Sequence, residues 1–135
     1  MVKRVAEEPS VLLPVIVTGE YRYGLLSSRE RVEREARFKG FCRACSLLSV
    51  DEETAGHYAA VRHRLRLAGT PIPENDIWIA ALCLQHGQRI LSNDRHFDLV
   101  QGVTRIGWWE CSHVRAPLAA TGEGEGVIAQ CRALD

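Results

Sequence analysis

The sequence predicts an α/β protein with a mostly parallel central sheet flanked by helices. Short apolar runs alternate along the chain with longer segments whose apolar residues recur at helical spacing, and this alternation is typical of parallel sheets. The chain has 135 residues, of which 46% are hydrophobic and 25% are charged. This length and composition are sufficient for one soluble domain with its own core, and a two-domain arrangement is not expected.

The first half of the chain is expected to contain two strands and three helices. The strands are predicted at 11–13 and 47–50, and the helices at about 15–26, 29–43 and 51–69. Pro14 suits the first turn of the helix that follows the first strand. Ser27 and Ser28 are suited to cap the second helix, and Gly69 supplies the end of the third.

The second half contains an apolar run, Ile77 to Leu84, that periodicity alone cannot assign to a strand or a helix. Its flanks favour a helix. Asn75 can act as the N-cap, Asp76 complements the positive end of the helix dipole, and Gly87 supplies the C-terminal stop. A strand at 88–92, a short helical turn at 95–100 and a last strand at 103–108 are expected to follow.

The end of the chain differs in composition from the rest. Residues 116–126 are rich in Gly, Ala and Glu, which is typical of a flexible linker. We therefore expect a domain over residues 1–111 and a flexible tail over residues 112–135. Residues 127–134 regain apolar character, so a strand, a fraying tail or both are open for them.

Charge and hydropathy limit the possible partners and location. Lys+Arg and Asp+Glu both number 17, so no overall basic field indicates a nucleic-acid partner, and any such partner must be held locally. The longest apolar run is too short to span a bilayer, and the first residues lack the apolar core of a signal peptide. A cytoplasmic protein without membrane contact is expected.

The chain has five cysteines, an odd number that cannot all be paired in disulfides. Cys42 and Cys45 form a single CxxC motif without the second CxxC of a zinc site. Structural zinc or redox chemistry is therefore not favoured. We expect Cys83 to be a small core residue, and Cys42 and Cys45 to be reduced thiols near the end of an Arg-rich helix.

Three acidic residues, Glu20, Asp76 and Asp94, stand where an apolar element begins, ends or turns its face. Glu20 has apolar neighbours one turn away on its helix and no cation at helical spacing. Asp76 also has a simple structural role, because an acidic residue in the first turn stabilises a helix by roughly 0.3 to 1 kcal/mol. Together they predict a buried carboxylate cluster for a divalent metal.

Asp94 follows a predicted strand by a few positions, which places it at the carboxyl end of that strand, where open α/β sheets bind ligands. An Asx-turn that closes the loop is the alternative role. His96, two residues later, can act as a base or a phosphate contact. A local packing and hydrogen-bonding turn is the preferred interpretation of this histidine.

Three motifs together closely resemble the PIN-domain ribonucleases of the VapC toxin type: PVIVTGEYRYG (14–24), PIPENDIWIAA (71–81) and NDRHF (93–97). The resemblance runs from about residue 7 to Trp109 and implies a PIN-like three-layer fold. It also implies a metal-dependent endoribonuclease, the toxin of a toxin–antitoxin pair, that is usually a homodimer and is silenced by a small antitoxin. Glu20, Asp76 and Asp94 then match the family's catalytic carboxylates, which hold Mg²⁺ or Mn²⁺ and activate water to hydrolyse RNA.

One feature departs from the family pattern. The family begins with a short apolar strand that ends in Asp and lies in the centre of the sheet, and residues 7–9 do not reproduce it. The N-terminal strand is therefore predicted to be missing, together with one metal ligand, and its loss would leave unpaired sheet edges.

Three explanations for this departure are open: a reading frame that starts too late, a decayed inactive gene copy, or residues 126–134 folding back as a substitute strand. The first two are preferred to the third. The absent aspartate also keeps a second function open, that of an inactive remnant that only binds an antitoxin or dimerises.

Overall fold

The computed structural model describes residues 11–107 and 126–130. Its strands are β1 (Val11–Pro14), β2 (Ser46–Leu48), β3 (Arg89–Leu91), β4 (Arg105–Ile106) and β5 (Val127–Ala129). Its helices are α2 (Val15–Leu25), α3 (Arg31–Ala44), α4 (Glu52–Leu67) and α5 (Glu74–His86), with a short 3₁₀ helix η1 (Arg95–Leu99).

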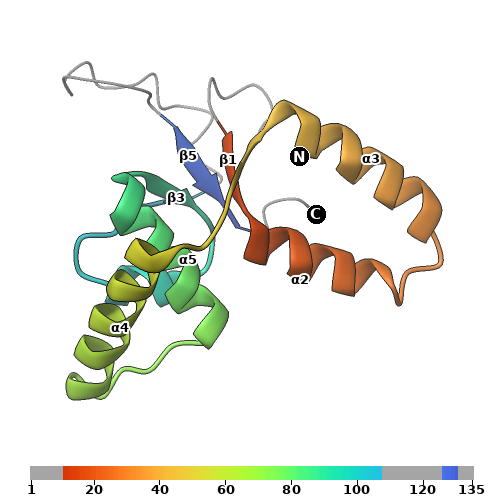
Figure 1. Cartoon of the computed structure of the whole chain (residues 1–135). Helices are drawn as coiled ribbons and strands as arrows, with labels where there is room; N and C mark the ends of the chain where they lie inside the picture. The colour runs from red at the N-terminus through yellow and green to blue at the C-terminus, as the bar shows by residue number, and fades with distance from the viewer. Residues whose placement is uncertain (1–10, 108–125, 131–135) are drawn as a thin grey trace.

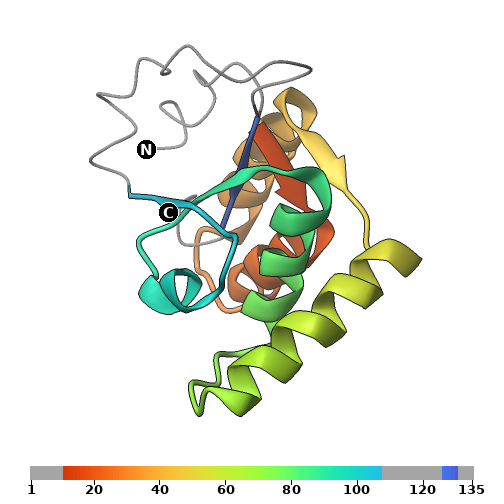
Figure 2. The ribbon, with the colours of Figure 1, turned by 90° about the vertical axis from the view of Figure 1, so that its left-hand side faces the viewer.

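The five strands form one sheet in the order β2-β1-β5-β3-β4, and every pairing is parallel. Helices α4 and α5 lie on one side of the sheet, and α2 and α3 form an arm on the other side (Figures 1 and 2). The predicted α/β fold with a parallel sheet between helical layers is confirmed.

The predicted elements agree with the structure to within a few residues, but two helix starts differ. Helix α5 begins at Glu74, and its N-cap is Pro73 rather than the expected Asn75. Pro73 suits that position because its ring fixes φ and it has no backbone N–H to satisfy. Helix α3 begins at Arg31, and Ser28 Oγ instead accepts the Glu30 backbone N–H at 3.2 Å in the preceding turn.

Helix α4 begins as the sequence predicts. The Asp51 side chain accepts the Thr54 backbone N–H at 3.0 Å, and Thr54 Oγ1 accepts the Asp51 backbone N–H at 3.0 Å. This reciprocal capping box satisfies two of the backbone donors that a helix start leaves open. The same hydrogen bond from Thr54 lowers the pKa of the Asp51 carboxyl.

Strand β5 occupies the centre of the sheet, between β1 and β3 (Figure 1). Val127 is in register with both Val11 and Arg89, and Ile128 is in register with both Leu12 and Ile90. All three β5 residues are buried, as is expected for a strand covered by helices on both faces of a parallel sheet.

The position of β5 corrects two expectations about the end of the chain. The substitute-strand explanation, which was the least preferred of the three, describes the arrangement that the structure has. Residues 127–129 also fall in the segment assigned to a flexible tail, yet they form a strand of the domain's sheet. The remainder of that segment, residues 112–125 and 131–135, lies outside the described residues.

The cysteines of the described part are free thiols, as expected. Cys83 is 2% exposed inside α5, and its burial raises its pKa to about 12. Burial also raises the pKa of Cys42, and that of Cys45 to about 11. Because the thiolate is the reactive form, these raised values do not favour nucleophilic or redox chemistry at neutral pH.

No helix within residues 11–107 and 126–130 has the length and apolar character needed to cross a membrane.

Candidate metal centre

The candidate site lies at the carboxyl ends of the central strands. The chain runs from β1 to β2 toward one edge of the sheet and from β3 to β4 toward the other, so the direction of winding reverses across β5. Ligands of open α/β sheets bind at such reversal points. A cavity of about 490 Å³ opens here, and its walls come from the following residues: Glu20, Pro73, Glu74, Asn75, Asp76, Asp94, His96 and Gln130.

Asp76 stands in the first turn of α5 and is 6% exposed. The positive end of the helix dipole stabilises a carboxylate at this position. Gln130 Nε2 donates to Asp76 Oδ1 at 3.1 Å, and His96 Nδ1 lies 3.1 Å from Asp76 Oδ2. Each carboxylate oxygen of Asp76 is thus held by a different side chain.

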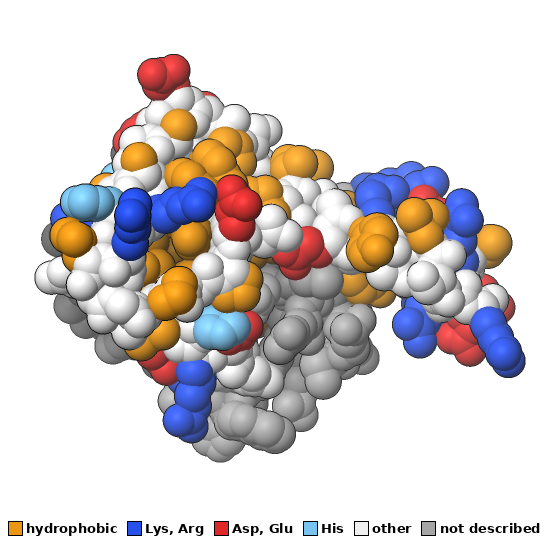
Figure 3. Space-filling view, turned by 90° about the horizontal axis from the view of Figure 1, so that it is seen from below, with side chains coloured by type: hydrophobic (Ala, Val, Ile, Leu, Met, Phe, Trp, Pro, Cys, Tyr) orange, Lys and Arg blue, Asp and Glu red, His pale blue; other side chains and the backbone are white. Residues whose placement is uncertain are grey.

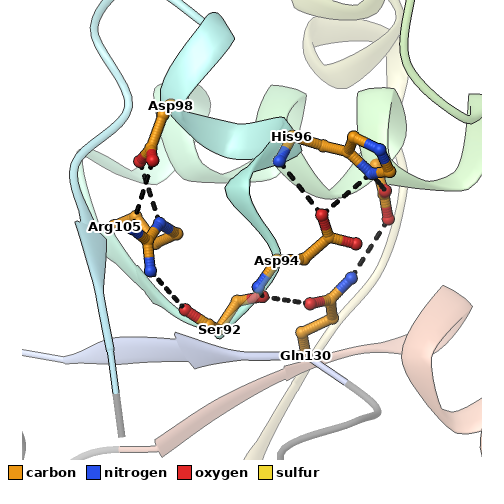
Figure 4. A network of polar contacts seen from close by, with 7 residues as sticks. Ser92, Asp94, His96, Asp98, Arg105 and Gln130 are labelled. Atoms are coloured by element: carbon orange, nitrogen blue, oxygen red, sulfur yellow. Dashed lines mark hydrogen bonds and ion pairs between the residues drawn. The ribbon is translucent and has the colours of Figure 1, made fainter. Parts of the chain in front are cut away.

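Asp94 follows β3 and is the N-cap of η1. Its Oδ1 accepts the His96 backbone N–H at 3.0 Å, and His96 Nδ1 lies 2.9 Å from the same oxygen. Ser92 Oγ accepts the Asp94 backbone N–H at 2.9 Å, which holds the loop against the end of β3 (Figure 4). Asp94 therefore closes the turn, as the alternative prediction has it, and also lines the cavity.

Glu20 enters the same cavity from α2, where it is half-buried. It stands apart from the closest group, in which Asp76, Asp94 and His96 each offer one ligand atom within 4.8 Å of the others. The structure thus brings the three predicted acidic residues to one cavity and gathers Asp76 and Asp94 most tightly. The face seen in Figure 3 carries red carboxylates and pale-blue histidines, and blue Lys or Arg side chains lie beside some of the carboxylates.

One buried residue of the site, Gln130, was not anticipated from the sequence. Gln130 follows β5 directly and is 4% exposed, and its Oε1 accepts a hydrogen bond from Ser92 Oγ. A signal was present, because an apolar run followed by a polar residue (VIAQ, 127–130) is the pattern of a buried strand whose end lines a site. In the resembling family, the central strand ends in a carboxylate, whereas an amide holds that position here.

The donor groups of the cavity fit a divalent cation. Four carboxylates, those of Glu20, Glu74, Asp76 and Asp94, line it together with one imidazole. Glu74 is paired with Arg62 at 3.7 Å, and among the described residues the other three carboxylates have no Lys or Arg beside them in the cavity wall. Carboxylates gathered in one cavity repel each other, and a bound cation removes that repulsion. Carboxylate and amide oxygens are the ligands of Mg²⁺ and Mn²⁺, and imidazole is accepted by the transition metals.

An ion pair stabilises the loop that carries Asp94 and His96. Arg105 Nε donates to Asp98 Oδ1 at 2.8 Å, and Arg105 Nη1 donates to the Ser92 carbonyl at 3.2 Å (Figure 4). The hydrogen bond from Arg105 lowers the pKa of the Asp98 carboxyl. The pair therefore joins η1 to β4 and to the end of β3.

We predict that this ion pair makes a small contribution to stability that is lost at low pH. Because the folded-state pKa of Asp98 is lowered, its contribution is fully present above the unfolded pKa of about 3.9 and is lost as the pH falls through the folded value. Asp98→Asn should reduce the free energy of unfolding by less than about 1 kcal/mol at pH 7, since the pair is partly exposed. Chemical denaturation of the wild type and of Asp98→Asn at pH 7 and pH 3 measures the difference in the free energy of unfolding. A difference that is larger at pH 3 than at pH 7 would contradict the prediction.

The comparisons with known proteins agree with this geometry. Residues 2–103 match the model of the PIN domain family. The chain is 33% identical over 94 residues to ribonuclease VapC4 of Mycobacterium tuberculosis, which covers 68% of this chain and 72% of that protein.

Two solved structures have the same fold. The DNA-bound VapBC of Salmonella typhimurium superposes with a TM-score of 0.68 at 26% identity, covering 72% of this chain and 74% of that one. VapBC-5 of M. tuberculosis, a member of the VapBC family of toxin-antitoxin systems, gives a TM-score of 0.61 at 21% identity, covering 73% and 98%.

The fold and the match over residues 2–103 define a PIN-domain protein. With the similarity to VapC4, the chain belongs to the PIN-domain family and is of the VapC type.

Proposed function

We propose that this chain is a metal-dependent endoribonuclease and the toxin component of a toxin–antitoxin pair. One observation carries the proposal: Glu20, Asp76 and Asp94 come from three distant segments and line one cavity at the carboxyl ends of the central strands. The similarity to ribonuclease VapC4 supports RNA as the substrate class. We also propose that the protein acts in the cytoplasm, where its RNA substrate would be found.

The proposed catalytic and metal-binding residues are Glu20, Asp76 and Asp94. These carboxylates would hold Mg²⁺ or Mn²⁺, and such an ion lowers the pKa of bound water and stabilises the charge that develops on a phosphate. The chain's own residues orient the site. Gln130 holds one oxygen of Asp76, and the turn from Ser92 to His96 holds Asp94.

The negative charge of the cavity sets a condition for the binding of an RNA backbone. A phosphate carries negative charge, and so do the carboxylates that line the cavity, so the two repel each other without a cation between them. Both the binding of RNA at this site and the cleavage step should therefore depend on the metal.

A protein partner is supported by the arm formed by α2 and α3. Tyr23, Leu26 and Val32 are 79%, 61% and 82% exposed there, and large apolar side chains exposed together are typical of interaction surfaces. Solved relatives of the VapBC family are toxin–antitoxin assemblies. We propose an antitoxin as the partner, and a homodimer as the form of the toxin.

The activity should depend on added divalent metal. The purified chain, incubated with total bacterial RNA, is expected to produce discrete fragments with Mg²⁺ or Mn²⁺ and none with excess EDTA, as resolved on a denaturing gel. Restoring the metal after EDTA should restore cleavage, which controls for irreversible damage. Cleavage that persists in EDTA would reject the metal mechanism. No cleavage with either ion would favour the inactive remnant that only binds an antitoxin or dimerises.

A further inference from the structure

We propose that His96 is a metal ligand of this site and that its nitrogen makes the site prefer Mn²⁺ to Mg²⁺. This inference rests on the proposed metal-dependent function and adds to it the class of ion and a further ligand. From the sequence, a packing and hydrogen-bonding turn is the preferred role of His96, with a base or phosphate contact as the alternative.

The first step is the position of the imidazole. His96 Nδ1 lies 2.9 Å from Asp94 Oδ1 and 3.1 Å from Asp76 Oδ2, so one ring nitrogen faces oxygens from two separate segments. Figure 4 shows the ring turned toward Asp94. Neighbouring ligands of one ion bound at about 2.1 Å are separated by about 3 Å when they stand at right angles. The two measured separations agree with that spacing.

The second step compares how many side chains a single proton and a divalent ion can each contact. A single Nδ1–H can point at only one of the two carboxylates. The contact with Asp76 Oδ2 is a hydrogen bond, and Asp94 Oδ1 then faces the same nitrogen without receiving its proton. A divalent ion accepts six or more ligands and can contact both carboxylates and the nitrogen together. The arrangement of Asp76, Asp94 and His96 is therefore better suited to an ion than to a proton alone.

The third step is the role of Gln130. Its Nε2 donates to Asp76 Oδ1, whereas Asp76 Oδ2 is the oxygen that faces His96 Nδ1. A carboxylate at the position of Gln130 would add a hard oxygen ligand, as Mg²⁺ prefers. With a neutral amide at this position, the two carboxylates and one imidazole are the closest set of metal-binding side chains in the described part of the chain.

The fourth step is the preference of the ions. Mg²⁺ binds oxygen ligands almost exclusively and keeps several waters, whereas divalent transition metals accept imidazole nitrogen readily. His96 should therefore contribute more to the affinity for Mn²⁺ than to the affinity for Mg²⁺.

The experiment measures binding, not cleavage. Titration calorimetry of the metal-free chain with MnCl₂ and with MgCl₂ is expected to give a dissociation constant at least about 10-fold lower for Mn²⁺. His96→Gln keeps an uncharged side chain with an oxygen donor. It should weaken Mn²⁺ binding by about 10-fold or more and change Mg²⁺ binding by less than about 3-fold. His57→Gln, in α4 and outside the residues that line the cavity, is the matched control and should change neither.

Electron spin-echo spectroscopy of bound Mn²⁺ supplies a direct readout of the ligand. The wild-type chain and the His57→Gln control should show modulation from a directly bound ¹⁴N nucleus, and His96→Gln should lack it. Mn²⁺ that binds without this signal in the wild type would overturn the assignment of His96 while leaving a metal-dependent nuclease in place. A chain that binds neither ion would overturn the assignment together with the proposed function.

Discussion

Deletion of residues 126–135 is expected to abolish the cooperative thermal unfolding of this chain. The deletion removes β5, whose three residues are buried at the centre of the sheet. Fully burying a Val or Ile side chain stabilises a protein by about 1.5 to 3 kcal/mol, and each buried backbone group left unpaired costs about 1 to 3 kcal/mol. Because β5 pairs with both β1 and β3, the total approaches the 5 to 15 kcal/mol by which domains are stable.

Calorimetry and near-ultraviolet circular dichroism of the chain ending at residue 125 measure this result. Point variants separate the loss of the strand from the loss of chain length. Ile128→Ala, which truncates a fully buried side chain, should lower the free energy of unfolding by about 2 to 5 kcal/mol. Val32→Ala, at a residue 82% exposed, should change it by less than about 0.5 kcal/mol. An unchanged midpoint in the shortened chain would show that β5 does not belong to the stable sheet.

The local elements could be predicted from the sequence because their signals are local. Pro14 after an apolar run, Asp51 before a helical segment and Gly87 after the buried helix each mark an element boundary within a few residues. The left-handed backbone of Gly87, with φ of 62°, is the conformation that a helix end commonly requires. The elements that follow from these signals agree with the structure.

Strand β5 could not be predicted with the same certainty because its signal is non-local. Three apolar residues after a Gly-rich segment are compatible with a strand or a tail, and nothing near them indicates which strands they pair with. The pairing of β5 is decided by the gap between β1 and β3, and this gap exists only once the remaining elements have folded. The preference against a substitute strand therefore came from judging residues 126–134 without that gap.

The candidate site was predicted in part for the same reason. Asp76 and Asp94 stand out because an acidic residue directly borders an apolar element, and Glu20 because its helix face is apolar. Gln130 was missed because its place depends on the position of β5. His96 was underestimated because the sequence shows its neighbour Asp94 but not Asp76, which lies 20 positions earlier and only 3.1 Å away.

Asp76→Asn is expected to reduce RNA cleavage by at least about 100-fold, which corresponds to about 2.7 kcal/mol of lost transition-state stabilisation. Asn keeps the size of the side chain but removes a negative charge and a strong oxygen ligand. It would also place an amide close to both Gln130 Nε2 and His96 Nδ1, the two groups that contact the carboxylate. The cleavage rate with saturating Mg²⁺ or Mn²⁺ is the measurement.

Thermal stability with and without metal distinguishes loss of the site from loss of the fold. A ligand present at 100 times its dissociation constant stabilises the folded state by about 2.7 kcal/mol, so Mn²⁺ should raise the wild-type unfolding midpoint. In Asp76→Asn the metal-free midpoint should change little, because relief of repulsion among the carboxylates offsets the loss of about 0.3 to 1 kcal/mol at the helix N-terminus. The increase caused by Mn²⁺ should disappear.

Asp51→Asn is the matched control, because Asp51 is also an acidic residue at the start of a helix but does not line the cavity. Asn is as good an N-cap as Asp, so this variant should keep its fold, its Mn²⁺-induced increase in midpoint and its cleavage rate. If Asp76→Asn cleaved RNA as fast as the wild type and kept its Mn²⁺ response, Asp76 would have only its helix-capping role. The metal site would then have to be sought elsewhere in the chain.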